Sequence, residues 1–146
     1  MISLNLPPFA YQVRKEADGF WIQCLIRKKW LVLTPEEWVR QHVIYLLTHE
    51  YKYPKSLLRI EGGLNVYKTG KRSDLVMYDR VGKPFLLVEC KAPHVKINQT
   101  VLEQILRYNH VLKAPFLVVS NGMDHFVFQM DASGQLTRLD TIPKFP

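Results

Sequence analysis

Three charged residues, Asp74, Glu89 and Lys91, have the types and spacing best suited to chemistry in this sequence. Asp74 precedes one apolar run, at 75–78, whereas Glu89 and Lys91 follow a second run, at 85–88. Two carboxylates held close together repel each other unless a cation lies between them. Hard oxygen ligands that leave room for water and a phosphate suit Mg²⁺ or Mn²⁺. The three residues therefore predict a divalent-metal site, and the alternative is an ordinary salt bridge of Lys91 at the end of a sheet.

The two apolar runs predict a β-hairpin, because residues 79–84 between them supply a turn glycine and proline. If the first and last of these residues close the hairpin, paired positions sum to about 163, which places Asp74 opposite Glu89 or the residue before it. Strand side chains alternate between faces, so we expect Glu89 and Lys91 on one face and Cys90 on the other. The hairpin therefore brings the two carboxylates and the lysine to one end of the sheet.

This stretch resembles a known family of nucleases. Asp74, followed fifteen residues later by Glu-Cys-Lys at 89–91, resembles the PD-(D/E)xK signature. The wording RSDLVMYD…KPFLLVECKAP is similar to the N-terminal nuclease domain of type I restriction enzyme R subunits, and the resemblance covers roughly residues 34–130. The proline of the family's motif is absent, because Ser73 stands before Asp74. The resemblance implies a restriction-endonuclease-like fold and a metal-dependent nuclease.

A first helix is predicted to start at Thr34 and to run to about Tyr51. Thr34 is the N-cap, the proline after it takes the first helical position, and Glu37 completes a capping box. Glu37 has a second interpretation, because nucleases of this resemblance often place a helix-borne acid near the metal. An apolar and a polar stripe lie on opposite faces of this helix. The apolar stripe consists of Trp38, Val39, His42, Val43 and Leu46, and the polar stripe of Glu37, Gln41 and Thr48.

A second helix is predicted from a cap at residues 98–100 to about Lys113. Apolar residues at 101, 105, 108 and 112 recur with helical spacing and form a sheet-facing stripe. Gln104 lies at the edge of this stripe, where its amide must find a partner. Gln104 and Tyr108 also fit a Q-x-x-x-Y motif, which resembles the motif beside the metal site of RecB-like and type I restriction nucleases.

The remaining apolar runs predict strands, in an order that defines the fold class. Residues 57–61 should form the first core strand, and the continuous apolar run at 116–120 should form a strand buried on both faces. Residues 125–130 should form the last strand, followed by a turn and a tail. The chain of 146 residues is thus expected to be one α/β domain, a mixed sheet flanked by helices. Its N-terminal β meander forms an extension at 1–33, and its core comprises 34–146.

The net charge of +7 favours a polyanionic partner, and nucleic acid is the expected one. A basic turn with Lys68, Lys71 and Arg72 lies just before Asp74 and could place cations beside a phosphodiester. A solvated hairpin turn explains these residues equally well. The basic run at 27–30, RKKW, could contact phosphate and stack on a base, although a solvated turn between strands is the commoner explanation.

Several other classes of protein do not fit the sequence. No segment approaches the ~20 apolar residues of a membrane span, and the N-terminus lacks the basic start and long apolar core of a secretion signal. The cytoplasm is therefore the expected compartment. Cys24 and Cys90 are expected to be reduced structural thiols, and the histidines lack the spacing of a zinc site. The sequence contains no Walker motif, so a motor function would need a partner.

The resemblance to the nuclease family implies a role for each candidate residue. Mg²⁺ or Mn²⁺ would be held by Asp74, Glu89 and the Cys90 carbonyl, and Lys91 would orient a water or stabilise charge in the transition state. The glutamine and tyrosine of the Q-x-x-x-Y motif would support Lys91 or bind the DNA strand. The expected function is hydrolysis of phosphodiester bonds in DNA, as a homodimer or with a partner that supplies motor or specificity functions. The alternative is a non-catalytic nucleic-acid-binding or adaptor module on the same fold.

Overall fold

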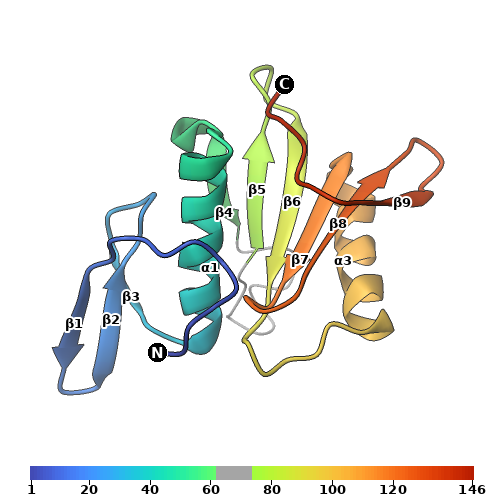
Figure 1. Cartoon of the computed structure of the whole chain (residues 1–146). Helices are drawn as coiled ribbons and strands as arrows, with labels where there is room; N and C mark the ends of the chain where they lie inside the picture. The colour runs from blue at the N-terminus through green and yellow to red at the C-terminus, as the bar shows by residue number, and fades with distance from the viewer. Residues whose placement is uncertain (62–73) are drawn as a thin grey trace.

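The computed structural model of the chain describes residues 1–61 and 74–146, which form two separate β-sheets and the helices that pack on them (Figure 1). The larger sheet has the strand order β4-β5-β6-β7-β8-β9, in which β6 and β7 are parallel and their connection runs through helix α3. The other neighbouring strands are antiparallel, so the sheet is mixed, and the predicted α/β class is confirmed. The elements of this part are β4 (Leu58–Glu61), β5 (Asp74–Tyr78), β6 (Pro84–Cys90), α3 (Gln99–Leu112), β7 (Phe116–Ser120), β8 (His125–Met130) and β9 (Leu136–Leu139).

The predicted N-terminal meander is the smaller sheet, with the antiparallel order β1-β2-β3. Its strands are β1 (Val13–Glu16), β2 (Gly19–Gln23) and β3 (Trp30–Val32). β2 ends at Gln23, because the chain turns at Cys24, whose carbonyl accepts a hydrogen bond from the backbone N–H of Lys28 at 3.0 Å. Figure 1 shows this sheet beside α1 (Pro35–Tyr45), on the side away from the large sheet.

The two long helices cover opposite faces of the six-stranded sheet. Successive residues of β5 and β6 alternate between two apolar clusters, as expected for strands buried on both faces. The α1-side cluster contains Val39, Val43, Leu75, Met77, Leu86, Val88 and Cys90. The α3-side cluster contains Val76, Leu87, Val101, Ile105 and Val119.

The first helix changes geometry before its end. α1 is followed directly by a π-helical turn, η1 (Leu46–Glu50), in which the N–H of Tyr51 donates to the carbonyl of Leu46 at 3.1 Å. The helical path therefore runs almost to the predicted end, with a wider last turn. A short 3-10 turn, η2 (Lys55–Leu57), then leads into β4. Within the described ranges no helix is both long enough and apolar enough to cross a membrane.

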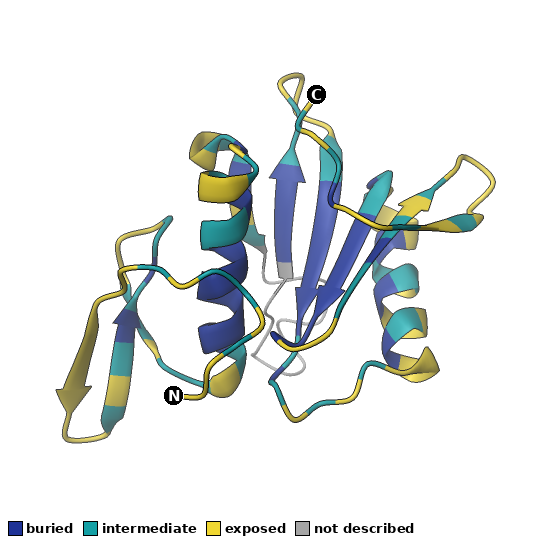
Figure 2. Ribbon diagram, in the orientation of Figure 1, coloured by how far each residue is buried: buried dark blue, intermediate teal, exposed yellow. Residues whose placement is uncertain are grey.

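Helix α1 is buried on every side from Glu37 to Ile44, after a first turn that is open to solvent (Figure 2). Trp38 and His42 belong to the predicted apolar stripe, but they pack against Phe9 and Tyr11 of the N-terminal segment, with ring centroids 4.8 to 5.0 Å apart. The indole N–H of Trp38 donates to the Ile2 carbonyl at 2.8 Å. Burial lowers the pKa of His42 from its ordinary value, against the smaller opposing effect of its hydrogen bond to the Trp38 carbonyl. The N-terminal segment thus closes a side of the helix that would otherwise meet water.

The polar stripe of α1 is also buried. The side chains of Glu37, Arg40 and Gln41 form one cluster, in which Arg40 makes an ion pair with Glu37 and the Gln41 amide donates to Glu37 at 2.7 Å. The carbonyl oxygen of the Gln41 side chain accepts from the backbone N–H of Leu25 at 2.9 Å. The cluster therefore joins α1 to the segment that follows β2.

The predicted capping box forms only in part. The Thr34 hydroxyl accepts from the N–H of Glu37 at 3.0 Å, which confirms Thr34 as the N-cap. The Glu37 carboxylate does not complete the box, because Arg40 and Gln41 bind it, and the Thr34 N–H donates instead to the Val32 carbonyl at 3.0 Å. Contacts with the next turn of the same helix therefore replace the cap interaction of Glu37.

We expect Gln41→Ala to lower the free energy of unfolding by about 1 to 3 kcal/mol, because it leaves the partly buried Leu25 N–H without its acceptor. Urea denaturation of both proteins measures this difference. The control is Gln99→Ala at the exposed start of α3, for which we expect little change. Equal unfolding free energies for Gln41→Ala and the native protein would show that the contact does not stabilise the docking of this segment.

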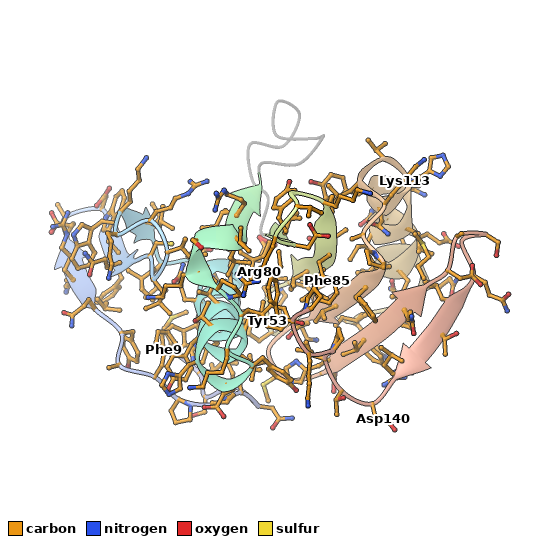
Figure 3. All side chains as sticks on the ribbon, turned by 90° about the horizontal axis from the view of Figure 1, so that it is seen from above. Phe9, Tyr53, Arg80, Phe85, Lys113 and Asp140 are labelled. Carbon is orange, nitrogen blue, oxygen red and sulfur yellow. The ribbon has the colours of Figure 1, made fainter. Side chains whose placement is uncertain are left out.

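The C-terminal segment is not the loose tail that the sequence predicted. Residues 136–139 form β9 at the edge of the large sheet, and Ile142 and Phe145 pack against the α1-side cluster. The hydroxyl of the buried Tyr53 donates to the carbonyl of Pro143 at 2.5 Å, and burial raises the pKa of Tyr53 well above its ordinary value. Tyr53 lies near Phe85 and Arg80 (Figure 3), and Arg80 stacks over the ring of Phe145. Contacts with distant residues therefore order this segment.

Candidate active site

The hairpin of β5 and β6 has the predicted register. Leu75 pairs with Val88 and Val76 with Leu87, so the continuing register places the backbone of Asp74 across from Glu89. On its other side, Asp74 pairs with Glu61 of β4. The backbone of Asp74 is described, whereas its side chain is outside the described part of the structure.

The turn that sets this register is closed by Asp79. Its carboxylate accepts from the N–H groups of Val81 and Lys83 at 3.0 and 2.9 Å, and its own N–H donates to the Lys83 carbonyl at 2.8 Å. Gly82 has a φ of 86°, a conformation that other residues adopt at a cost. The register shifts at Tyr78, which pairs with Pro84, so the irregularity lies at the turn end and leaves the Asp74 end in regular pairing.

Glu89 and Lys91 lie together at the carboxyl end of β6. The Glu89 residue is 6% exposed, and its carboxylate oxygen Oε2 lies 3.6 Å from Nζ of Lys91, whose side chain is 22% exposed. Cys90 between them is fully buried in the α1-side cluster. The predicted alternation is thus confirmed, and a nearly buried carboxylate has a partly exposed ammonium group beside it. Since burying an unpaired carboxylate is costly, the cation helps to keep Glu89 in place.

Helix α3 begins close to this pair along the chain and carries the two residues of the Q-x-x-x-Y motif. Asn98 caps the helix, with its side-chain oxygen 3.1 Å from the N–H of Val101. Tyr108 is half-buried and packs against the α3-side cluster, as its place in the stripe predicted. Gln104 is exposed, so water can satisfy its amide and the expected need for a protein partner is wrong.

The connection from Lys91 to α3 is fixed by contacts that the sequence analysis missed. The N–H of Lys91 donates to the Ser120 carbonyl at 2.8 Å, and the amide of the buried Asn121 donates to the Val95 carbonyl at 2.8 Å. Asn121 directly follows the strand predicted at 116–120, and no local pattern signals its role. The same connection exposes His94 and Lys96 to solvent, two further basic residues beside the candidate site.

Glu37 lies at the start of α1, and Figure 1 shows this end of the helix and the carboxyl end of β6 at the same end of the molecule. The Glu37 residue is 7% exposed, and Arg40 and Gln41 bind its carboxylate. These contacts balance its charge within the protein.

The structure describes one of the two predicted acidic metal ligands in full. Within residues 1–61 and 74–146, excluding side chains that are not described, no group of three or more His, Cys, Asp or Glu side chains could hold a metal ion. The Asp74 side chain is not among these described groups. The predicted DNA-binding residues Lys68, Lys71 and Arg72 also lie outside the described residues. The donor set that is visible, a nearly buried carboxylate at a strand end with the Asp74 backbone opposite, has the oxygen chemistry that Mg²⁺ or Mn²⁺ requires.

Comparison with known proteins supports the resemblance seen in the sequence. The model of the family "Type I restriction enzyme R protein N terminus" matches residues 35–143, from the first residue of α1 to the segment after β9. The chain belongs to this family. The match to the R protein N terminus includes the whole six-stranded sheet, and the sheet β1-β2-β3 precedes it.

An individual related protein shows the same relationship. The type I restriction enzyme EcoAI endonuclease subunit from Escherichia coli is 29% identical to this chain over 103 residues. The aligned region is 68% of this chain and 12% of the relative, so the chain corresponds to a small part of that subunit. No solved structure matches the chain.

Proposed function

We propose that this chain is a divalent-metal-dependent nuclease domain with a restriction-endonuclease-like fold that hydrolyses phosphodiester bonds in DNA. The observation that carries the proposal is the position of Glu89 and Lys91. A nearly buried carboxylate lies 3.6 Å from a lysine at the end of β6, and the backbone of Asp74 lies across the hairpin from it. Membership of the type I restriction enzyme R protein N-terminus family supports this reading of the site.

The residues at this strand end fit a divalent metal ion. Asp74, Glu89 and the Cys90 carbonyl would hold Mg²⁺ or Mn²⁺, which when bound supplies Lewis-acid activation of water and neutralises phosphate charge. If Glu89 held a metal ion, it would pair less strongly with Lys91, and the ammonium group of Lys91 would be available to the substrate. The partly exposed Lys91 would then orient the attacking water or donate to phosphate oxygens as their charge increases.

Other candidate residues take supporting roles in this proposal. Gln104 is exposed on α3 and would contact the DNA strand, whereas the packing of Tyr108 suits it to hold α3 against the sheet. Lys68, Lys71 and Arg72 would contact phosphates together with His94 and Lys96. For Glu37 the contacts with Arg40 and Gln41 favour a structural role over a metal-binding one.

A non-catalytic nucleic-acid-binding or adaptor module is the second candidate, since Glu89 and Lys91 also suit a simple ion pair at the end of β6. In either case we propose one domain over 1–146, with 1–33 as an extension. Motor and specificity functions would come from a partner, and a homodimer is the other arrangement we propose.

We expect the purified protein to cut DNA in Mg²⁺ or Mn²⁺ and to leave it intact in EDTA. Circular and linear DNA are incubated separately and resolved on gels, because nicking of the circle reports endonuclease activity and shortening of the linear form alone reports exonuclease activity. Glu89→Gln, which keeps the shape of the buried side chain, is the inactive control. Wild-type protein that leaves every DNA and RNA form intact would contradict the nuclease and favour the binding module.

A further inference from the structure

The sheet β1-β2-β3 has two unlike faces. Strand pairing places Arg14 opposite Trp21 and Trp21 opposite Val32, so these residues share one face, which also carries Trp30. We name these four residues the Trp face. The other face carries Ile22, which is completely buried. The family match begins after this sheet, so the Trp face lies outside the residues that the family model matches.

The Trp face is accessible and has aromatic rings next to cations. The Arg14 guanidinium lies 4.4 Å from the centre of the Trp30 ring, and its side chain is 50% exposed. Val32 is 53% exposed, and both tryptophans are partly exposed. A guanidinium stacked on a tryptophan keeps its charge available to an anion on its outer side.

Two lysines extend this surface at the turn between β2 and β3. Lys28 has a φ of 62°, its N–H donates to the Cys24 carbonyl, and Lys28 and Lys29 are exposed. Arg27 of the same basic run is used within the protein, because it donates to the Ile60 carbonyl at 2.9 Å. The turn is therefore an ordered structure that presents two ammonium groups.

The acidic residues of the sheet are engaged locally. Glu16 pairs with Arg14 at 3.4 Å, and Asp18 accepts from the indole N–H of Trp21 at 3.1 Å. Five cationic residues lie between residues 13 and 33, but Lys15 is on the opposite face and Arg27 is used within the protein, so three cations remain for this surface against the two carboxylates. The surface therefore suits a polyanion better than a neutral or basic protein surface.

We propose that the Trp face binds single-stranded nucleic acid. Trp21 and Trp30 stack on bases, while Arg14, Lys28 and Lys29 contact phosphates, which is the combination that single-strand-binding surfaces use. Single strands are favoured because the faces of bases in a duplex are already stacked. This inference does not rest on the nuclease proposal, since such binding needs no metal ion and uses residues away from β6.

The test is fluorescence anisotropy of a labelled oligothymidylate in EDTA, where no cleavage interferes. Trp21→Ala and Trp30→Ala should each weaken binding by about tenfold, the effect of losing one stacked base. The double variant Lys28→Ala, Lys29→Ala should reduce the slope of log affinity against log salt by roughly 1 to 1.5. Phe20→Ala and Lys15→Ala are matched controls, because these two residues pair with each other on the opposite face and are exposed.

Several outcomes would overturn the inference. These are absence of oligothymidylate binding by the native protein, an equal loss in the Phe20→Ala or Lys15→Ala control, and equal binding by the native protein and both tryptophan variants. If the tryptophan variants changed only the sedimentation of the protein, the face would be a protein interface instead. The lysine variants keep the aromatic packing intact, so they test the surface even if a tryptophan variant fails to fold. Binding that persists in a protein without nuclease activity would leave this inference standing and remove only the proposed function.

Discussion

Lys91→Ala is expected to reduce the rate of DNA cleavage by ~100-fold or more while the protein still folds and still binds metal and DNA. The ammonium group acts mainly on charge that develops in the transition state, so its loss affects the rate more than the binding of the ground state. The measurements are the cleavage rate at saturating DNA, the metal affinity and the unfolding free energy of the same variant.

The position of Lys91 makes this variant informative. Its side chain is partly exposed and contributes little to the apolar core, so its removal should cost no more than about 1 to 2 kcal/mol, most of it from the lost partner of Glu89. Lys144→Ala is the matched control, since it removes the same charge from an exposed position in the C-terminal segment, which has no role in the proposed site. Cleavage by Lys91→Ala at the native rate would remove Lys91 from the mechanism and leave it as a salt-bridge partner only.

Binding of Mg²⁺ or Mn²⁺ should raise the melting temperature of the native protein and should be lost in Asp74→Ala and in Glu89→Gln. A ligand that binds only the folded state stabilises it, by about 2.7 kcal/mol when its concentration is 100 times its dissociation constant. Each variant removes one carboxylate from a site that needs both. Isothermal calorimetry and thermal unfolding, with and without metal, measure these effects.

A suitable control for this experiment is Glu103→Gln, which removes an exposed carboxylate from α3 and should leave metal binding unchanged. If Asp74→Ala bound the metal ion as tightly as the native protein, the ion would bind elsewhere. If the native protein itself shows no heat of metal binding in the calorimeter, the proposed metal site at this strand end is contradicted.

Features of this protein that depend on neighbouring residues could be predicted from its sequence. The apolar runs and the turn between them predicted the β5–β6 hairpin and its register, because alternation and turn chemistry are local properties. The same alternation correctly separated Glu89 and Lys91 from the buried Cys90. Thr34 was identified as a helix cap, and the cap of α3 was placed within residues 98–100, for the same reason.

Features that depend on contacts between residues far apart in the chain became known from the folded structure alone. Gln41 is buried because the segment after β2 folds back onto α1, where the Leu25 N–H donates to its side-chain oxygen. Asn121 reaches the Val95 carbonyl, 26 residues away, and so holds the connection that places Lys91 relative to α3. A buried polar group must find its hydrogen-bond partner wherever the fold provides one, and no short pattern in the sequence records which distant residue that is.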